Sequence, residues 1–70
     1  MFRLVKSLTI KDVKLPYSII VSFGDGKELR KHLVSRYSQG DFSCQIERYT
    51  SIATINFRNE IDAADFLMRL

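Results

Sequence analysis

Cysteine and histidine, the residue types of disulfides and of structural zinc sites, are nearly absent from this sequence. Its 70 residues include one cysteine, Cys44, and one histidine, His32. A lone cysteine excludes a disulfide within the chain, and one cysteine with one histidine cannot supply the four ligands of a structural zinc site. Any stabilisation beyond the hydrophobic core must therefore come from self-association or from a partner.

Long hydrophobic runs are also absent. No apolar stretch approaches the roughly 18 residues that indicate a membrane span, and Arg3 and Lys6 interrupt the first stretch where a signal peptide would need an unbroken one. We therefore expect a cytoplasmic protein without a membrane partner. A chain of 70 residues predicts one domain, residues 1–70. Its core is small, because a chain of this size buries only about 60% of its unfolded surface.

Charge is unevenly distributed along the chain. The net charge is +3, but residues 1–36 carry eight basic and three acidic side chains, whereas residues 37–70 carry three basic and five acidic ones. This asymmetry suits the attraction of a polyanion, an acidic protein or a second copy of the chain to one side. A solvated surface with uneven charge is the commonest meaning of such a pattern.

Alternating apolar residues predict four strands. Residues 17–23 and 51–57 are the most apolar and are expected at the centre of a sheet, whereas 2–10 and 43–49 are more polar and are expected at its edges. Lys6 interrupts the alternation of the first strand, which is typical of an edge strand or a bulge. The turn between the last two strands contains no Gly, Asn or Pro to define it.

Two helices are predicted from their capping residues. Asp25 followed by Glu28 has the spacing of a capping box, so a helix is expected from about residue 26 to residue 37. Gly40 is expected to end it in a left-handed conformation. Asn59 is expected to cap a last helix that runs to the C-terminus. The buried stripe of the first helix is expected at a spacing of four: Leu29, Leu33 and Tyr37.

The predicted order is strand, strand, helix, strand, strand, helix. It equals the order of the ferredoxin-like sandwich when the last strand of that fold is moved to the front. We therefore expect an α+β two-layer sandwich, a circularly permuted ferredoxin-like fold with a four-stranded antiparallel or mixed sheet and two helices on one face. The alternative is an open meander with two helices packed on one side.

The stretch IATINFRNEIDAADFL, residues 52–67, resembles the third strand and second helix of the RNA-recognition motif family. The longer signature of that family reads basic, Gly, aromatic, Gly or Ala, Phe, Val, any residue, aromatic. Ala53, Ile55 and Phe57 match it at inward positions. The outward positions, where the family stacks bases on aromatic rings, hold Ile52 and Thr54. The resemblance therefore implies the packing of a strand on a helix, and RNA binding by the sheet is not expected.

The last helix carries two apolar stripes on roughly opposite sides, one of them formed by Ile61, Ala64 and Met68. A helix that covers one face of a two-layer domain needs only one stripe, and an exposed second stripe marks an interface. The sequence leaves open whether the other stripe wraps against the first helix or contacts a partner. The predicted protein interface comprises that other stripe and a part of the sheet face: Ala63, Phe66, Leu67, Leu70, Ile20 and Ile52.

The first helix is basic, and most of its charge is predicted on the outward face. A solvated face is the commonest meaning of such a pattern. The alternative is a binding face for nucleic acid or an acidic partner, formed by Lys27, Arg30, Lys31 and Arg36.

Candidate catalytic groups are few. The least implausible cluster is Glu28, His32 and Ser35, but a serine beside a histidine on a helix surface is commonplace. Asp62 and Asp65 lack a third ligand for a divalent cation, and Cys44 is predicted to be a buried small hydrophobe. We expect no enzymatic activity, no metal, no cofactor and no small-molecule substrate.

The leading functional hypothesis is a small non-enzymatic protein-interaction module that acts by protein–protein contact or homodimerisation. Compact single domains of this kind, including those that phages encode, are often accessory or regulatory proteins. The alternative is a nucleic-acid-binding protein that uses the basic first helix.

Overall fold

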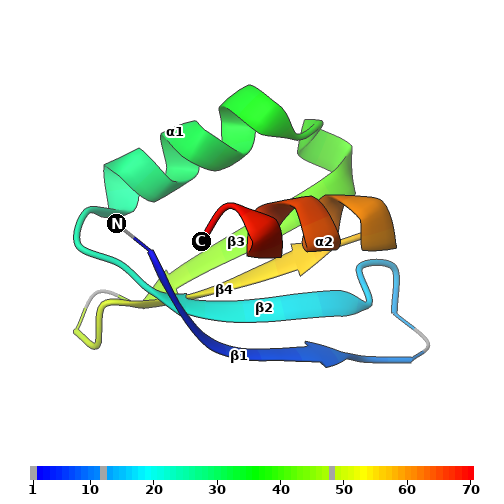
Figure 1. Cartoon of the computed structure of the whole chain (residues 1–70), viewed down its shortest axis with the longest axis horizontal. Helices are drawn as coiled ribbons and strands as arrows, with labels where there is room; N and C mark the ends of the chain where they lie inside the picture. Colours follow the sequence, from blue (N-terminus) through cyan, green and yellow to red (C-terminus); the bar gives the residue numbers. More distant parts are fainter. Residues whose placement is uncertain (1, 12, 48) are drawn as a thin grey trace.

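The computed structural model describes residues 2–11, 13–47 and 49–70 of the chain. Its elements follow in the predicted order (Figure 1). They are β1 (Arg3–Thr9), β2 (Tyr17–Ser22), α1 (Gly26–Arg36), β3 (Phe42–Glu47), β4 (Ile52–Phe57) and α2 (Glu60–Met68), with a short 3₁₀ turn at Gln39–Asp41. No helix formed by these residues is both long enough and apolar enough to cross a membrane.

The four strands form one antiparallel sheet in the order β1-β2-β4-β3. Figure 1 shows both helices on the same face of the sheet, so the fold is an α+β fold, as predicted. β2 and β4 are the central strands, and they pair directly although α1 and β3 lie between them in the chain. The alternative prediction, an open meander, is wrong because the strands of a meander pair in chain order.

Edge strand β1 contains a bulge at Val5, where its register with β2 shifts between Leu4 and Lys6. An extra residue on one strand reverses which side chains face each side of the sheet. Leu4 therefore lies opposite the inward-facing Val21, whereas Lys6 and Leu8 face away from the helices. The irregularity predicted at Lys6 is confirmed.

The hydrophobic core lies between the central strands and the helices. Side chains alternate in and out along β4, as in a strand with one buried face. Burial of one large apolar side chain stabilises the fold by about 1.5–3 kcal/mol. The core is formed by Ile19, Val21, Leu29, Leu33, Tyr37, Ala53, Ile55, Phe57, Ala63 and Phe66.

The two ends of α1 differ in how well the sequence predicts them. The Asp25 carboxylate accepts a hydrogen bond from the backbone N–H of Lys27 at 3.0 Å, which confirms the predicted N-cap. At the other end Tyr37 has an extended backbone and a buried side chain. The prediction that Gly40 ends the helix in a left-handed conformation is wrong, because the helix ends at Arg36 and no described glycine has a positive φ.

The turn between β3 and β4 is held by a contact outside the turn. Ser51 has a φ of 55°, a left-handed conformation that costs a non-glycine residue roughly 1–2 kcal/mol. Its carbonyl oxygen accepts a hydrogen bond from the backbone N–H of Phe23 at 3.0 Å. That tertiary bond explains how a turn without Gly or Asn forms here. Residue 48 of the predicted third strand lies outside the described residues.

Candidate interaction surface

Helix α2 is anchored by an inward stripe. Phe66 is 1% exposed and Ala63 is 6% exposed, and the Phe66 ring packs on Phe57 with 5.7 Å between the ring centroids. Leu67 is half-buried against the same core. Ala63 and Phe66 belong to the predicted protein interface, but the structure places both side chains inside the monomer. The sequence leaves open whether this stripe packs within the monomer or contacts a partner. For Ala63 and Phe66, the structure shows packing within the monomer.

The opposite stripe of α2 faces solvent. Ile61 is 81% exposed and Met68 is 86% exposed, and the exposed Ala64 lies between them. Leu70, which the sequence also predicts at the interface, is 38% exposed just beyond the helix. We call Ile61, Ala64 and Met68 the outer stripe. The sequence shows both stripes of α2 but not directly which one is buried. The signal that could have identified the buried stripe is the size of Phe66, because a large aromatic ring is usually buried in a core.

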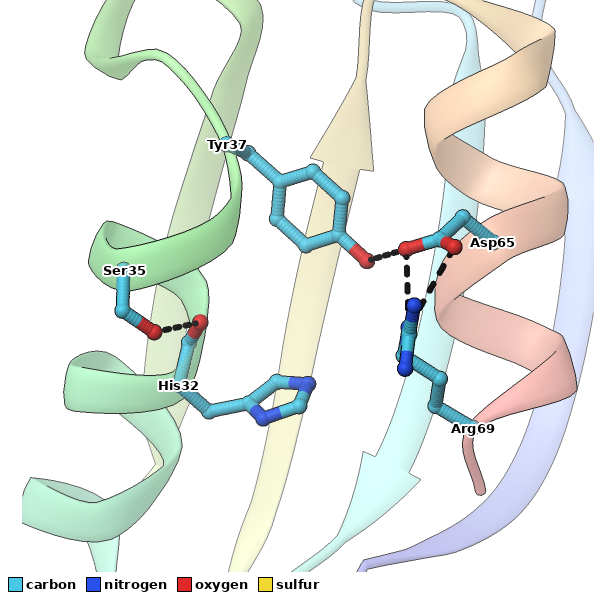
Figure 2. Close-up of polar contacts among 5 residues, drawn as sticks. All are labelled: His32, Ser35, Tyr37, Asp65 and Arg69. Atoms are coloured by element: carbon cyan, nitrogen blue, oxygen red, sulfur yellow. Dashed lines mark hydrogen bonds and ion pairs between the residues drawn. The ribbon is translucent and has the colours of Figure 1, made fainter.

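A polar link joins α2 to the end of α1 (Figure 2). The Tyr37 hydroxyl donates a hydrogen bond to Asp65 Oδ2 at 2.9 Å. Arg69 Nε donates to both oxygens of the same carboxylate, at 3.2 and 3.1 Å. Sequence reasoning missed this link, because nothing local pairs Tyr37 with a residue of the last helix. The link limits rotation of α2 about its own axis and so helps to keep the outer stripe outward.

The hydrogen bonds of this link shift the protonation of both partners. Those from Arg69 and Tyr37 lower the pKa of the Asp65 carboxyl, because they favour its charged form. Burial, together with the bond to Asp65, raises the pKa of the Tyr37 hydroxyl above its ordinary value of 10.0. Near neutral pH the link therefore joins an ionised carboxylate to a neutral phenol.

His32 lies beside the link and packs against two aromatic rings. Its ring centroid is 5.6 Å from that of Phe2 and 5.9 Å from that of Phe66, both in edge-on geometry. Burial, and then the nearby charges of Arg36 and Arg69, lower the pKa of His32 below 6.5. Its surroundings are those of a neutral ring that packs the two helices together.

The structure does not assemble the catalytic cluster considered from the sequence. The Ser35 hydroxyl donates to the backbone carbonyl oxygen of His32 at 3.0 Å, and Figure 2 shows the imidazole pointing away from it. Among the residues that the structure describes, no side-chain hydrogen bond joins the imidazole ring to Ser35 or Glu28. Across residues 2–11, 13–47 and 49–70, no group of three or more His, Cys, Asp or Glu side chains is placed to hold a metal ion.

An open groove separates α2 from edge strand β1. α2 packs on β2 and β4, so the helix-facing side of β1 is left uncovered and nearly all of that strand is exposed. The groove has a volume of about 300 Å³, with Ser7 and Thr9 of β1 on one side and Ala64 and Leu67 of α2 on the other. The outer stripe thus continues through Ala64 to the rim of this groove.

Ile20 and Ile52, the other predicted interface residues, lie on the sheet face that points away from the helices. Both are partly exposed, and each pairs with a small polar residue of the neighbouring strand, Thr54 and Ser22 respectively. This face is otherwise largely polar. The two isoleucines lie on the opposite side of the sheet from α2 and do not extend the outer stripe.

The outer face of α1 carries basic charge. The four basic residues predicted as a binding face are all exposed, and none forms an ion pair with another residue in the described part of the chain: Lys27, Arg30, Lys31 and Arg36. Cys44 on β3 is half-buried near Arg30, and burial raises the pKa of its thiol. This agrees with the predicted inward position of Cys44.

Comparisons of this chain with protein-family models, with curated proteins and with solved structures found no match. The candidate surfaces are therefore interpreted from their own residues. Two of the surfaces formed by the described residues carry candidate binding residues predicted from the sequence or exposed by the fold: the apolar outer stripe of α2 and the basic outer face of α1.

Proposed function

We propose that this chain is a small protein-interaction module that acts by contact with another protein and not by catalysis. The observation that carries the proposal is the exposure of Ile61 and Met68, 81% and 86%, on a helix already anchored by its inward stripe. Single exposed apolar residues are ordinary, but an aligned stripe of them is typical of a contact surface. The proposal includes an accessory or regulatory role and a cytoplasmic location.

Affinity capture from the native cell, with and without nuclease, tests this function. The bait is the whole chain, compared with a double variant of the outer stripe, Ile61→Asp with Met68→Glu. Both positions are highly exposed, so the double variant is expected to fold. Its matched control is a double variant on α1, Lys27→Glu with Lys31→Glu. Loss of a nuclease-resistant protein partner with the α2 variant alone supports the proposal, and identical capture by all three baits contradicts it.

Nucleic-acid binding through α1 is the second candidate function. The observation that favours it is the exposed set of four basic side chains without ion-pair partners in the described part of the chain. Phosphate contacts of this kind give an affinity that falls steeply with salt. Gel shifts of mixed-sequence DNA and RNA at low and high salt test it. Binding is expected to weaken with salt and with the Lys27→Glu and Lys31→Glu substitutions, and a free probe at low salt contradicts it.

The fold proposal is that the sandwich is a circular permutant of the ferredoxin-like fold. The strand order β1-β2-β4-β3 is what results when the last strand of that fold is moved to the front. Phe2 and Leu70 line the same surface pocket, so the two ends of the chain lie close together. A permuted chain that starts at Val13 and carries residues 2–11 on a short flexible linker after Leu70 is expected to fold cooperatively. An unfolded permutant contradicts the proposal.

A further inference from the structure

We propose that the outer stripe of α2 binds the outer stripe of a second copy, with the two helices antiparallel. This inference rests on the proposed function, because it names the partner of the same surface. Ile61 and Met68 lie equally far, about 5 Å along the helix axis, from a point between Ala64 and Asp65. A two-fold axis through that point places Ile61 of each copy beside Met68 of the other.

The centre of the stripe suits the close approach of two helices. Ala64 is small and exposed, so little side chain stands between the two axes at the crossing point. Asp65 would bring charge to the same place, but its carboxylate is bonded to Tyr37 and Arg69 on the side toward α1. The middle of the contact therefore holds Ala64 and a carboxylate that is already bonded within its own copy, with the larger apolar side chains at the two ends. Packed helices generally lie about 8–10 Å apart between their axes, and a small residue at the crossing favours the lower end of that range.

The charges of α2 favour the antiparallel orientation over the parallel one. Its first turn is acidic, with Glu60 and Asp62, and Arg69 follows its last turn. A parallel pair would bring the two acidic first turns together, which is repulsive, whereas Arg69 is already paired with Asp65 of its own helix. The antiparallel pair brings the Arg69 end of each copy to the acidic end of the other and also opposes the two helix dipoles.

The size of the stripe sets the expected strength of the dimer. A stable interface usually buries about 800 Å² on each partner. Three side chains of one helix supply less, even with Leu67, which lines the groove beside Ala64. The dimer is therefore expected to dissociate in the micromolar range, which makes it reversible and dependent on concentration.

Disulfide trapping tests the orientation directly. All variants carry Cys44→Ser, so that the added cysteine is the only one. Ala64→Cys is expected to cross-link with itself under mild oxidation, since it lies beside the two-fold axis. A mixture of Ile61→Cys and Met68→Cys is expected to form a mixed dimer faster than either variant alone. Val34→Cys on α1, a position 59% exposed, is the matched control and is expected to cross-link only slowly.

Sedimentation equilibrium of the unmodified chain over a wide concentration range measures the dimer itself. Met68→Glu is expected to raise the dimer Kd at least about tenfold, while Val34→Glu leaves it unchanged. A chain that stays monomeric at its highest soluble concentration overturns the inference, as do faster Ile61–Ile61 and Met68–Met68 cross-links. If the monomeric chain still captures another protein through the outer stripe, self-pairing fails while the proposed function stands.

Discussion

Helices α1 and α2 lie in the same layer of the molecule and differ in what they show to solvent. Each rests on the sheet through one buried stripe. The outward positions of α1 hold mostly charged residues such as Lys27 and Lys31, with Val34 as the large apolar exception, whereas those of α2 hold Ile61 and Met68. Helix α2, with nine residues, therefore exposes two large apolar side chains to water. Helix α1, with eleven residues, exposes its lysines instead.

This difference distinguishes the side chains that stabilise the fold, which face the sheet, from those that do not, which face solvent. Both helices obtain their stabilisation from the inward stripe, since burial of apolar surface is the main favourable contribution to folding. The lysines of α1 keep an outer surface soluble without any partner. The apolar outer stripe of α2 adds nothing to the core. Its side chains contribute favourable free energy only when another surface covers them and removes them from water. The contrast between the helices is therefore the reason to place the proposed interaction surface on α2.

The largest expected effect tests whether the two inward stripes are equally necessary. Phe66→Ala is expected to lower the free energy of unfolding by about 3–5 kcal/mol, and Leu33→Ala on α1 by about 2–5 kcal/mol, because each leaves a cavity in a closely packed core. Small domains have only about 5–15 kcal/mol of stability. Urea titrations followed by circular dichroism measure both. A loss below about 1 kcal/mol for Phe66→Ala would show that α2 is not held by this ring.

A smaller effect is expected from cutting the polar link between the helices. Tyr37→Phe removes the hydroxyl that donates to Asp65 and is expected to cost about 1.5 kcal/mol, at the low end for bonds to charged groups because the Asp65 carboxylate is partly exposed. The ring itself stays in the core. The same urea titrations measure the loss. Tyr17→Phe, on β2, is the control, and an equal loss from both variants would contradict a specific role for the link.

Acidification is expected to weaken the contact between the helices at His32. The folded state lowers the pKa of His32 below 6.5, so as the pH falls through 6.5 the unfolded chain takes up a proton that the folded chain resists. Stability from this residue is therefore complete at neutral pH and declines below about pH 6.5. Melting temperatures of the wild type and His32→Gln between neutral pH and pH 5 check it. An identical slope for both would rule out His32 as the cause.

The smallest effect on stability is expected from exchanging the outer surfaces. Ile61→Lys on α2 and Lys31→Ile on α1 are each expected to change the free energy of unfolding by no more than about 0.5 kcal/mol, because both positions are exposed. Their effects on association are expected to be opposite in sign, with Ile61→Lys weakening dimerisation in sedimentation experiments. If Ile61→Lys destabilised the monomer strongly, the outer stripe would be part of the fold and the contrast would fail.

The sequence predicts the elements of this fold well, because their periodicity is strong. The alternation in residues 17–23 and 51–57 marks the central strands, and Asp25 marks the start of α1. The end of α1 is predicted to within one residue, but the backbone conformation after it is mispredicted, because Gly40 signals a local left-handed turn while Tyr37 leaves the helix to enter the core. A contact between distant residues overrides the local signal there.

Only part of the candidate surface on α2 can be predicted from the sequence. Periodicity shows that α2 has two apolar stripes, but it does not show which stripe faces the sheet. That choice depends on where the helix lies relative to β2 and β4, and on the bond from Tyr37 to Asp65. Neither is encoded by local spacing. The basic residues of α1 are easier to predict, since their charge alone places them in water.

The direct pairing of β2 with β4 also determines how fast the chain can fold. The partners Tyr17 and Phe57 meet only when the chain between them, which contains α1 and β3, has been gathered into a closed loop. The pairs of β1 with β2 and of β3 with β4 are hairpins that form from neighbouring segments. Non-local pairing costs chain entropy before any contact repays it. The folding rate is therefore expected to be set by closure of the central pair, and the two edge hairpins contribute little to the barrier.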